Sequence, residues 1–226
     1  LPKTDVRSRT VPLRGITARG AGDQVEYALE NTAGILEALE AYFGIPYPYE
    51  KLDLIAAPDY AFGAMENPGA IVYREYLLLM NEGSALSQKR AYARVHSHEL
   101  AHQWFGNLVT EKSGDHHWLH EGFATYYAYL AEQHLFGDDH FYWKLYETLN
   151  QLKDQADKEE GQSLLDPKAS SLTFYEKGAW ALFMLKSEIG EAAFKKGIKN
   201  YLKKHQFKNV TVDDFLKEME SASGKN

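Results

Sequence analysis

Two histidines four residues apart place the strongest constraint on how this chain can fold. His98 and His102 flank Glu99 in the run HELAH, which fits the pattern HExxH. Residues i and i+4 share one face of an α-helix, so a helix here lets both imidazoles reach a single zinc ion. Glu121 follows with 18 residues between it and His102, and we expect it to be the third ligand. Three protein ligands leave one tetrahedral position to water, the arrangement of a catalytic zinc ion.

Local patterns predict a chain of mixed secondary structure. Apolar residues at helical spacing predict a helix over 24–43 that ends at Gly44. Residues 1–20 read as an irregular segment or edge strand, and strands are predicted over 51–57 and 70–80. Further helices are predicted from Ser84 or Ser87 to about Phe105, over 117–136, from Gly137 across Leu152, and over 174–189, 191–204 and 211–221.

This order of elements predicts an α+β architecture in one domain, residues 1–226. Strands concentrate in a first part, about 1–83, and helices in a second part, about 84–226. We expect the metal site to lie at the seam between the two parts.

Composition narrows the class of protein. Hydrophobic residues at 44% and charged residues at 25% are globular values, and no apolar run of about 18 residues suggests a membrane span. The net charge of -7 argues against a nucleic-acid partner, whose binding surface would be basic. The chain has no cysteine, which excludes disulfides, thiolate metal ligands and a cysteine nucleophile. We expect a soluble protein whose compartment, cytoplasmic or extracytoplasmic, the sequence leaves open.

Three motifs in the same order resemble the zinc aminopeptidases of the aminopeptidase N family. They are Gly63-Ala64-Met65-Glu66-Asn67, then HELAHQWFGNLVT around His98, then Gly122-Phe123-Ala124 directly after Glu121. The resemblance covers nearly all of residues 1–221 and implies a two-lobed, thermolysin-like catalytic domain, a gluzincin. It also implies an upstream β domain and a downstream helical domain that this chain lacks. Because Leu1 is not a methionine, we expect the chain to be a piece of a longer protein.

The same residues suggest how the chemistry is divided. A zinc ion polarises the substrate carbonyl and lowers the pKa of its bound water to about 7. Glu99 lies beside the metal rather than on it, which suits a general base that passes the water proton to the leaving amine.

Two further roles rest on the resemblance alone. The run Phe174-Tyr175-Glu176-Lys177-Gly178 resembles the family's Tyr-Glu-Lys-Gly motif, so Tyr175 is expected to support the transition state. The motif Gly63–Asn67 is expected to bind substrate. Glu66 would hold the free amino terminus of the peptide, and the backbone of Gly63 and Ala64, with Met65 and Asn67 beside them, would line it.

The remaining histidines do not suggest a second metal site. His96 is rotated about 200° around the helix from His98 and cannot share its ion. The cluster His116, His117 and His120 is expected to hydrogen-bond the ligands or to be exposed. His120 also departs from the family pattern, which often has Asn before the ligand glutamate, and Pro68 stands where Trp is common. Both departures bear on substrate preference.

The sequence thus predicts a zinc metallo-aminopeptidase domain that removes the first residue of peptides with a free amino terminus. Two alternatives stay open. One is a bifunctional enzyme of the leukotriene-hydrolase branch, which also opens an epoxide. The other is a non-catalytic interaction domain of the same fold, which would be expected to have lost metal ligands.

Overall fold

The computed structural model describes residues 11–225, which mix helices with a few short strands. These residues form two compact units that divide after Gln103. Each unit has its own buried apolar core. Within residues 11–225, no helix combines the length and the apolar character needed to cross a bilayer.

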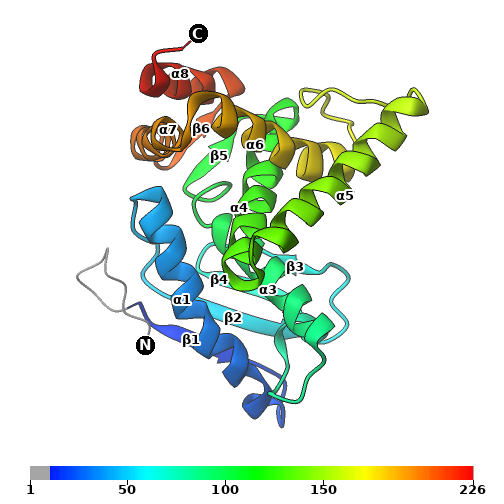
Figure 1. The fold of residues 1–226 in the computed structure, drawn as a ribbon. Helices are drawn as coiled ribbons and strands as arrows, with labels where there is room; N and C mark the ends of the chain where they lie inside the picture. Colours follow the sequence, from blue (N-terminus) through cyan, green and yellow to red (C-terminus); the bar gives the residue numbers. More distant parts are fainter. Residues whose placement is uncertain (1–10, 226) are drawn as a thin grey trace. The chain divides into compact units, whose positions relative to one another are not determined.

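The first unit is built on a four-stranded sheet with the strand order β1-β2-β4-β3 (Figure 1). The three longer strands run parallel, with Leu54 of β2 opposite Ile71 of β4, and β3 pairs antiparallel with β4. β1 is an edge strand, as predicted for part of residues 1–20; residues 1–10 of that prediction lie outside the described residues. The strands are β1 (Leu13–Ile16), β2 (Leu52–Ala57), β3 (Ala64–Met65) and β4 (Ala70–Arg74).

Two long helices cover this sheet, and they lie side by side across one face of it (Figure 1). The predicted first helix is confirmed, and Gly44 ends it in a left-handed conformation, φ 63°, with its N–H bonded to Glu40 O. The Tyr92 hydroxyl donates to Ala28 O at 3.1 Å and joins the two helices. The helical elements of the unit are η1 (Gly22–Val25), α1 (Glu26–Phe43), α2 (Glu75–Leu78) and α3 (Leu86–Ala101).

Two predicted boundaries in this unit are wrong. The strand predicted over 70–80 stops at Arg74, and its second half forms the single helical turn α2. An apolar run alone does not distinguish a strand from a buried helical turn. Here the side chain of Gln88 stabilises the turn, because its Nε2 donates hydrogen bonds to Tyr76 O and Leu79 O, at 2.8 and 3.1 Å. The next helix, α3, begins at Leu86 without a serine cap and ends at Ala101 rather than near Phe105.

The second unit is largely helical and is organised around α4, which packs against η3, α5 and α6 (Figure 1). Stacked and edge-on aromatic rings fill its core, namely Phe105, Phe123, Tyr127, Tyr201 and Phe215. Its elements are β5 (Val109–Glu111), η2 (Gly114–His116), α4 (Trp118–Phe136), α5 (Asp138–Asp157), η3 (Leu172–Lys177), α6 (Gly178–Ile189), α7 (Glu191–Lys204), β6 (Lys208–Val210) and α8 (Val212–Ser223).

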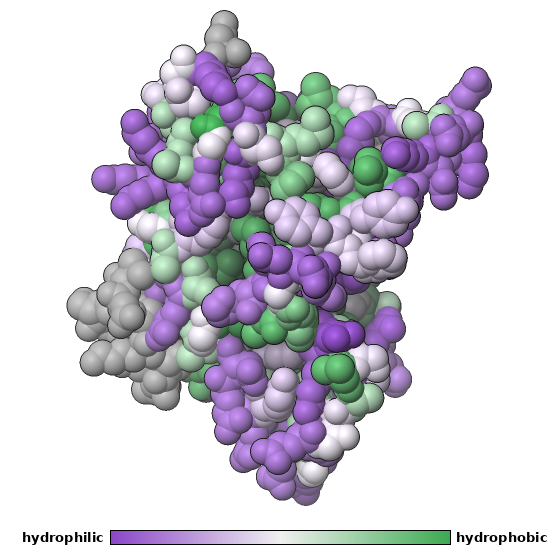
Figure 2. Space-filling model, viewed as in Figure 1, coloured by the Kyte–Doolittle hydropathy of each residue, from purple (hydrophilic) through white to green (hydrophobic). Residues whose placement is uncertain are grey.

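The helices predicted for this part of the chain are confirmed, with one difference. Residues 172–177, at the start of the predicted helix 174–189, form a π-helical turn before α6 begins. The polar stretch 153–163 is mostly exposed and contributes to the hydrophilic end of α5 in Figure 2.

Candidate metal centre

The HExxH motif lies at the end of α3, and its two histidines converge. The Nε2 atoms of His98 and His102 are 3.0 Å apart, and the planes of the two rings are inclined by 87°. Two nitrogens bound to one tetrahedral zinc ion at ~2.0–2.1 Å lie about 3.3 Å from each other. The pair therefore already has the spacing of two ligands on one ion. His102 keeps this geometry because its N–H still bonds to His98 O, at 3.1 Å, in the last turn.

A buried histidine on the same helix determines how α3 is rotated. The Tyr73 hydroxyl lies 2.6 Å from Nδ1 of His96, and Thr32 Oγ1 lies 3.0 Å from Nε2. Since Thr32 donates its own proton to Ala28 O, it accepts from Nε2–H, and Nδ1 accepts from Tyr73. Burial lowers the pKa of His96 to about 3, so the ring is neutral. This network joins α3 to both β4 and α1.

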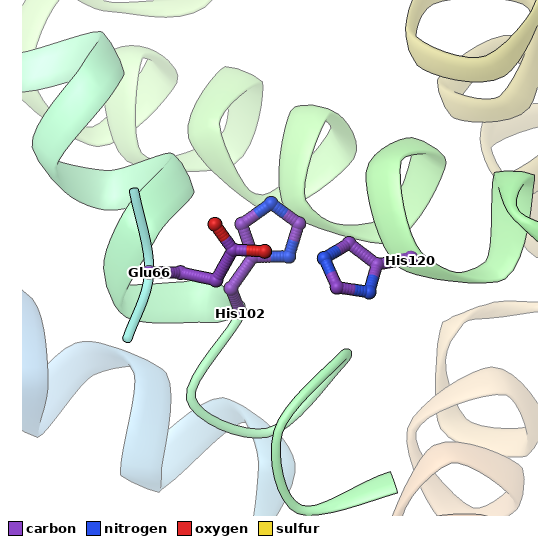
Figure 3. A group of neighbouring side chains, drawn as sticks. All are labelled: Glu66, His102 and His120. Atoms are coloured by element: carbon purple, nitrogen blue, oxygen red, sulfur yellow. The ribbon is translucent and has the colours of Figure 1, made fainter. Parts of the chain in front are cut away.

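The proposed amine-binding motif lies in the same unit as the histidine pair. Ala64 and Met65 form β3, and Gly63 O accepts a hydrogen bond from the N–H of Arg74 on β4. A carboxylate oxygen of Glu66 lies within 4.8 Å of a ring nitrogen of His102. Figure 3 shows the Glu66 carboxylate beside His102 at the end of α3, and also draws His120, which belongs to the second unit.

The second unit carries the other two predicted residues on neighbouring elements. Glu121 lies in the first turn of α4, and Tyr175 lies in the π-helical turn η3 that packs against α4. Gly122 and Gly178 meet where these elements cross. A Cβ atom built on Gly122 would lie 2.9 Å from Gly178 Cα and 3.2 Å from Phe174 O. Only glycine allows this approach. Gly122, directly after Glu121, and Gly178, three residues after Tyr175, therefore set the distance between α4 and the turn that carries Tyr175.

A carboxylate that carried no sequence signal organises the histidines before Glu121. Glu111, at the end of β5, places one oxygen 3.0 Å from Nδ1 of His117 and the other 3.0 Å from Nδ1 of His120. Burial raises the pKa of Glu111, but the hydrogen bonds from His117 and His120 outweigh it and hold that pKa well below its usual range. His117 in turn places Nε2 3.8 Å from Glu121 Oε1. No motif contains Glu111, and only its contacts reveal it.

His120 also explains a glycine in the HELAHQWFG run. Gly106 has φ 125°, and a Cβ atom there would lie 2.5 Å from Cε1 of His120. The imidazole therefore packs directly on the Gly106 backbone. The unusual histidine before Glu121 therefore needs a glycine at position 106, shortly after α3.

The structure groups the predicted site residues into two sets. His98, Glu99, His102 and the Gly63–Asn67 motif belong to the first unit, and Glu121 and Tyr175 belong to the second. Each set is ordered by contacts within its own unit.

Comparison with known proteins decides the family. A sequence model described as "Peptidase family M1 domain" matches residues 27–226. The chain belongs to peptidase family M1. The resemblance to zinc aminopeptidases inferred from three motifs is thereby confirmed, and it extends over most of the chain.

Individual members of the M1 family are similar over nearly the whole chain. Aminopeptidase M1 of Arabidopsis thaliana is 38% identical over 98% of this chain and 26% of its own length. Glutamyl aminopeptidase of Bos taurus is 38% identical over 97% of this chain and 24% of its own. Leucyl aminopeptidase of Saccharolobus solfataricus is 38% identical over 93% and 28%. The chain spans about a quarter of the length of the curated relatives it matches.

Proposed function

We propose that the chain is the catalytic domain of a zinc-dependent aminopeptidase with a thermolysin-like arrangement, in which His98, His102 and Glu121 hold one zinc ion. The observation that carries the proposal is a carboxylate, that of Glu66, within 4.8 Å of a histidine whose Nε2 is paired with a second one at 3.0 Å. A pair of metal-binding histidines alone suits many hydrolases. The same pair with an anionic group about one residue length away suits an enzyme that binds the free amino terminus of its substrate and cleaves the first peptide bond.

The donor set fits zinc, because two imidazoles and one carboxylate are the ligands of one type of catalytic zinc site. When bound, the ion supplies a Lewis acid for the substrate carbonyl and a water molecule with a pKa of about 7. Glu99 would take a proton from the attacking water at its carboxylate and would pass it to the nitrogen of the first peptide bond as the C–N bond breaks.

Glu66 supplies the selectivity in this proposal. An α-ammonium group paired with the Glu66 carboxylate forms a charge-assisted hydrogen bond, and this leaves only the first peptide bond within reach of the metal. β3 is the last strand of its sheet, so an extended peptide can align along Gly63, Ala64 and Met65 through backbone hydrogen bonds, with Asn67 beyond them.

Tyr175 is proposed to donate a hydrogen bond to the oxyanion as it forms. Its place in a π-helical turn supports this role, because single π-turns inside helices occur frequently at functional sites. The close contact of Gly122 with Gly178 supports it too, since it ties the Tyr175 turn to the helix that carries Glu121.

The test measures a free-amine substrate in two variants and compares it with an N-acetylated substrate in the unmutated protein. Glu66→Ala should lower kcat/KM for an aminoacyl-amide with a free amine by about 10- to 100-fold, the value of a charge-assisted hydrogen bond. Zinc content should stay unchanged. Glu82→Ala, at an exposed glutamate of the same unit, is the matched control and should leave kcat/KM unaltered. If the unmutated protein cleaves N-acetylated and free substrates equally well, the proposal is wrong.

A further inference from the structure

A glutamine directly after the second zinc ligand joins the two parts of the proposed site in the first unit. Gln103 is completely buried. Its Oε1 accepts a hydrogen bond from the Gly69 N–H at 3.0 Å, and its Nε2 donates to Glu66 O at 3.0 Å and to Glu99 O at 3.3 Å. One side chain thus bonds the backbone of the amine-binding residue and the backbone of the general base.

The segment that Gln103 contacts forms a tight turn over residues 67–70. The N–H of Ala70 bonds to Asn67 O at 2.9 Å, and Gly69 has φ 65°. Proline followed by a left-handed glycine is the residue order of a type II turn. A Cβ atom on Gly69 would lie 3.0 Å from Lys51 O, so a larger residue would be crowded against that carbonyl as well as strained by the positive φ. Pro68, which departs from the family pattern, therefore belongs to the turn that presents the Gly69 N–H.

We infer that Gln103 is a positioning residue that sets the distance between the amine-binding carboxylate of Glu66 and the turn of α3 that carries Glu99. The inference rests on the proposed function, because that function makes this distance matter. An aminopeptidase must hold the amino terminus and the first peptide bond at once, so a change in this distance misplaces the peptide bond against the metal. Displacement by about 1 Å can cost roughly 100-fold in rate.

The polar groups that Gln103 satisfies make the clamp specific to an amide side chain. It offers one acceptor and two donors, and all three are used by backbone atoms. Methionine has nearly the same volume and none of these groups. Glutamate keeps the acceptor for Gly69 and loses both donors. Gln103→Met therefore removes all three bonds, and Gln103→Glu removes the two donated to Glu66 and Glu99, each with little change in size.

Gln88, near the start of α3, offers a matched control. Gln88 also donates through Nε2 to two backbone carbonyls of a neighbouring segment, those of Tyr76 and Leu79, at 2.8 and 3.1 Å. Gln88→Met removes the same kind of contact away from the residues proposed to bind substrate. Gln88→Met and Gln103→Met should both lower the melting temperature, but only the change at Gln103 should alter catalysis.

The experiment measures kcat/KM for a free-amine aminoacyl-amide and its N-acetylated form, zinc content, and hydrogen exchange in peptides covering residues 63–70, all in the zinc-loaded protein. Gln103→Met and Gln103→Glu should lower the free-amine value about 10- to 100-fold, leave zinc content and the N-acetylated rate unchanged, and speed exchange over residues 63–70. Gln88→Met should stay within about twofold of the unmutated value.

Three results would overturn the inference. The first is a Gln103→Met protein whose activity matches that of Gln88→Met. The second is equal loss for free and acetylated substrates, which marks a purely structural residue. The third needs no variant: a Gly69 amide that exchanges in the unmutated protein as fast as in an unfolded peptide. A zinc-loaded, unmutated protein without turnover would instead refute the proposed function, and exchange over residues 63–70 in the variants would still decide whether Gln103 holds this segment.

Discussion

The contact between Gly122 and Gly178 allows a sharp test of how the second unit orders its part of the site. Gly122→Ala adds one methyl group at the crossing of α4 with the start of α6. That methyl group would lie 2.9 Å from Gly178 Cα, 3.0 Å from Gly178 C and 3.2 Å from Phe174 O, whereas 3.4–4 Å is ordinary contact. All three neighbours are backbone atoms and cannot rotate away. The two elements must therefore separate by about 0.5 Å or more to restore normal contact.

The expected magnitudes for stability and activity differ. Inserting a methyl group into a packed contact costs about 1–3 kcal/mol, and replacing glycine by alanine inside a helix returns about 1 kcal/mol. The free energy of unfolding should therefore fall by roughly 0–2 kcal/mol. The effect on kcat/KM should be larger, on the order of 10- to 100-fold, because Glu121 directly precedes Gly122 and Tyr175 lies on the element that is pushed away.

Gly34→Ala is the control, since Gly34 lies inside α1 and a Cβ atom there meets nothing within 4 Å. This change should raise the free energy of unfolding by about 0.5–1 kcal/mol and leave kcat/KM unaltered. Denaturant unfolding and aminoacyl-amide turnover measure both quantities. A Gly122→Ala protein as stable and as active as the Gly34→Ala protein would show that the glycine contact does not order Glu121 and Tyr175.

Three further predictions follow from individual side chains. His102→Ala should lose most bound zinc, whereas Glu99→Gln should keep its zinc and lose activity; zinc analysis beside turnover separates the two roles, and a Glu99→Gln protein with normal turnover would contradict the assignment of the base. Tyr175→Phe should lower kcat and kcat/KM together by about 100-fold, and a rise in KM alone would instead mark a binding residue. The hydrogen bond from Arg14 holds the pKa of the Asp53 carboxyl below its usual range, so its stabilisation is present above about pH 4 and is lost as pH falls further. Asp53→Asn should therefore destabilise the protein by about 1 kcal/mol at pH 7, and denaturant unfolding at pH 3 should show a smaller difference.

Local sequence was sufficient for the elements whose signals lie within a few residues. The helix over 24–43 and its end at Gly44 follow from apolar spacing and from a glycine that accepts a left-handed conformation. The i, i+4 spacing of His98 and His102 likewise predicts that both rings share one face, and their Nε2 atoms lie 3.0 Å apart. These features depend on the geometry of one helix and need no distant partner.

Other features were decided by residues far away in the sequence. Glu75–Leu78 reads as strand but forms the helical turn α2, which Gln88 of α3 stabilises by donating hydrogen bonds to Tyr76 O and Leu79 O. Glu111 belongs to no motif, and its importance comes from the two histidines that it meets across a turn. Gln103 looks like one more polar residue in HELAHQWFG until its bonds to the Glu66–Gly69 segment are seen.

The sequence by itself therefore determined the family, the helix that carries the two histidines, and the types of residue available for the chemistry. Tertiary structure decided how accurately those residues are held, through the Gln103 side chain, the Glu111 carboxylate and the Gly122–Gly178 contact. The physical reason is range. Helical periodicity and glycine conformation are local properties of the chain, whereas a buried hydrogen bond or a backbone contact below 3 Å exists only once separate segments have packed together.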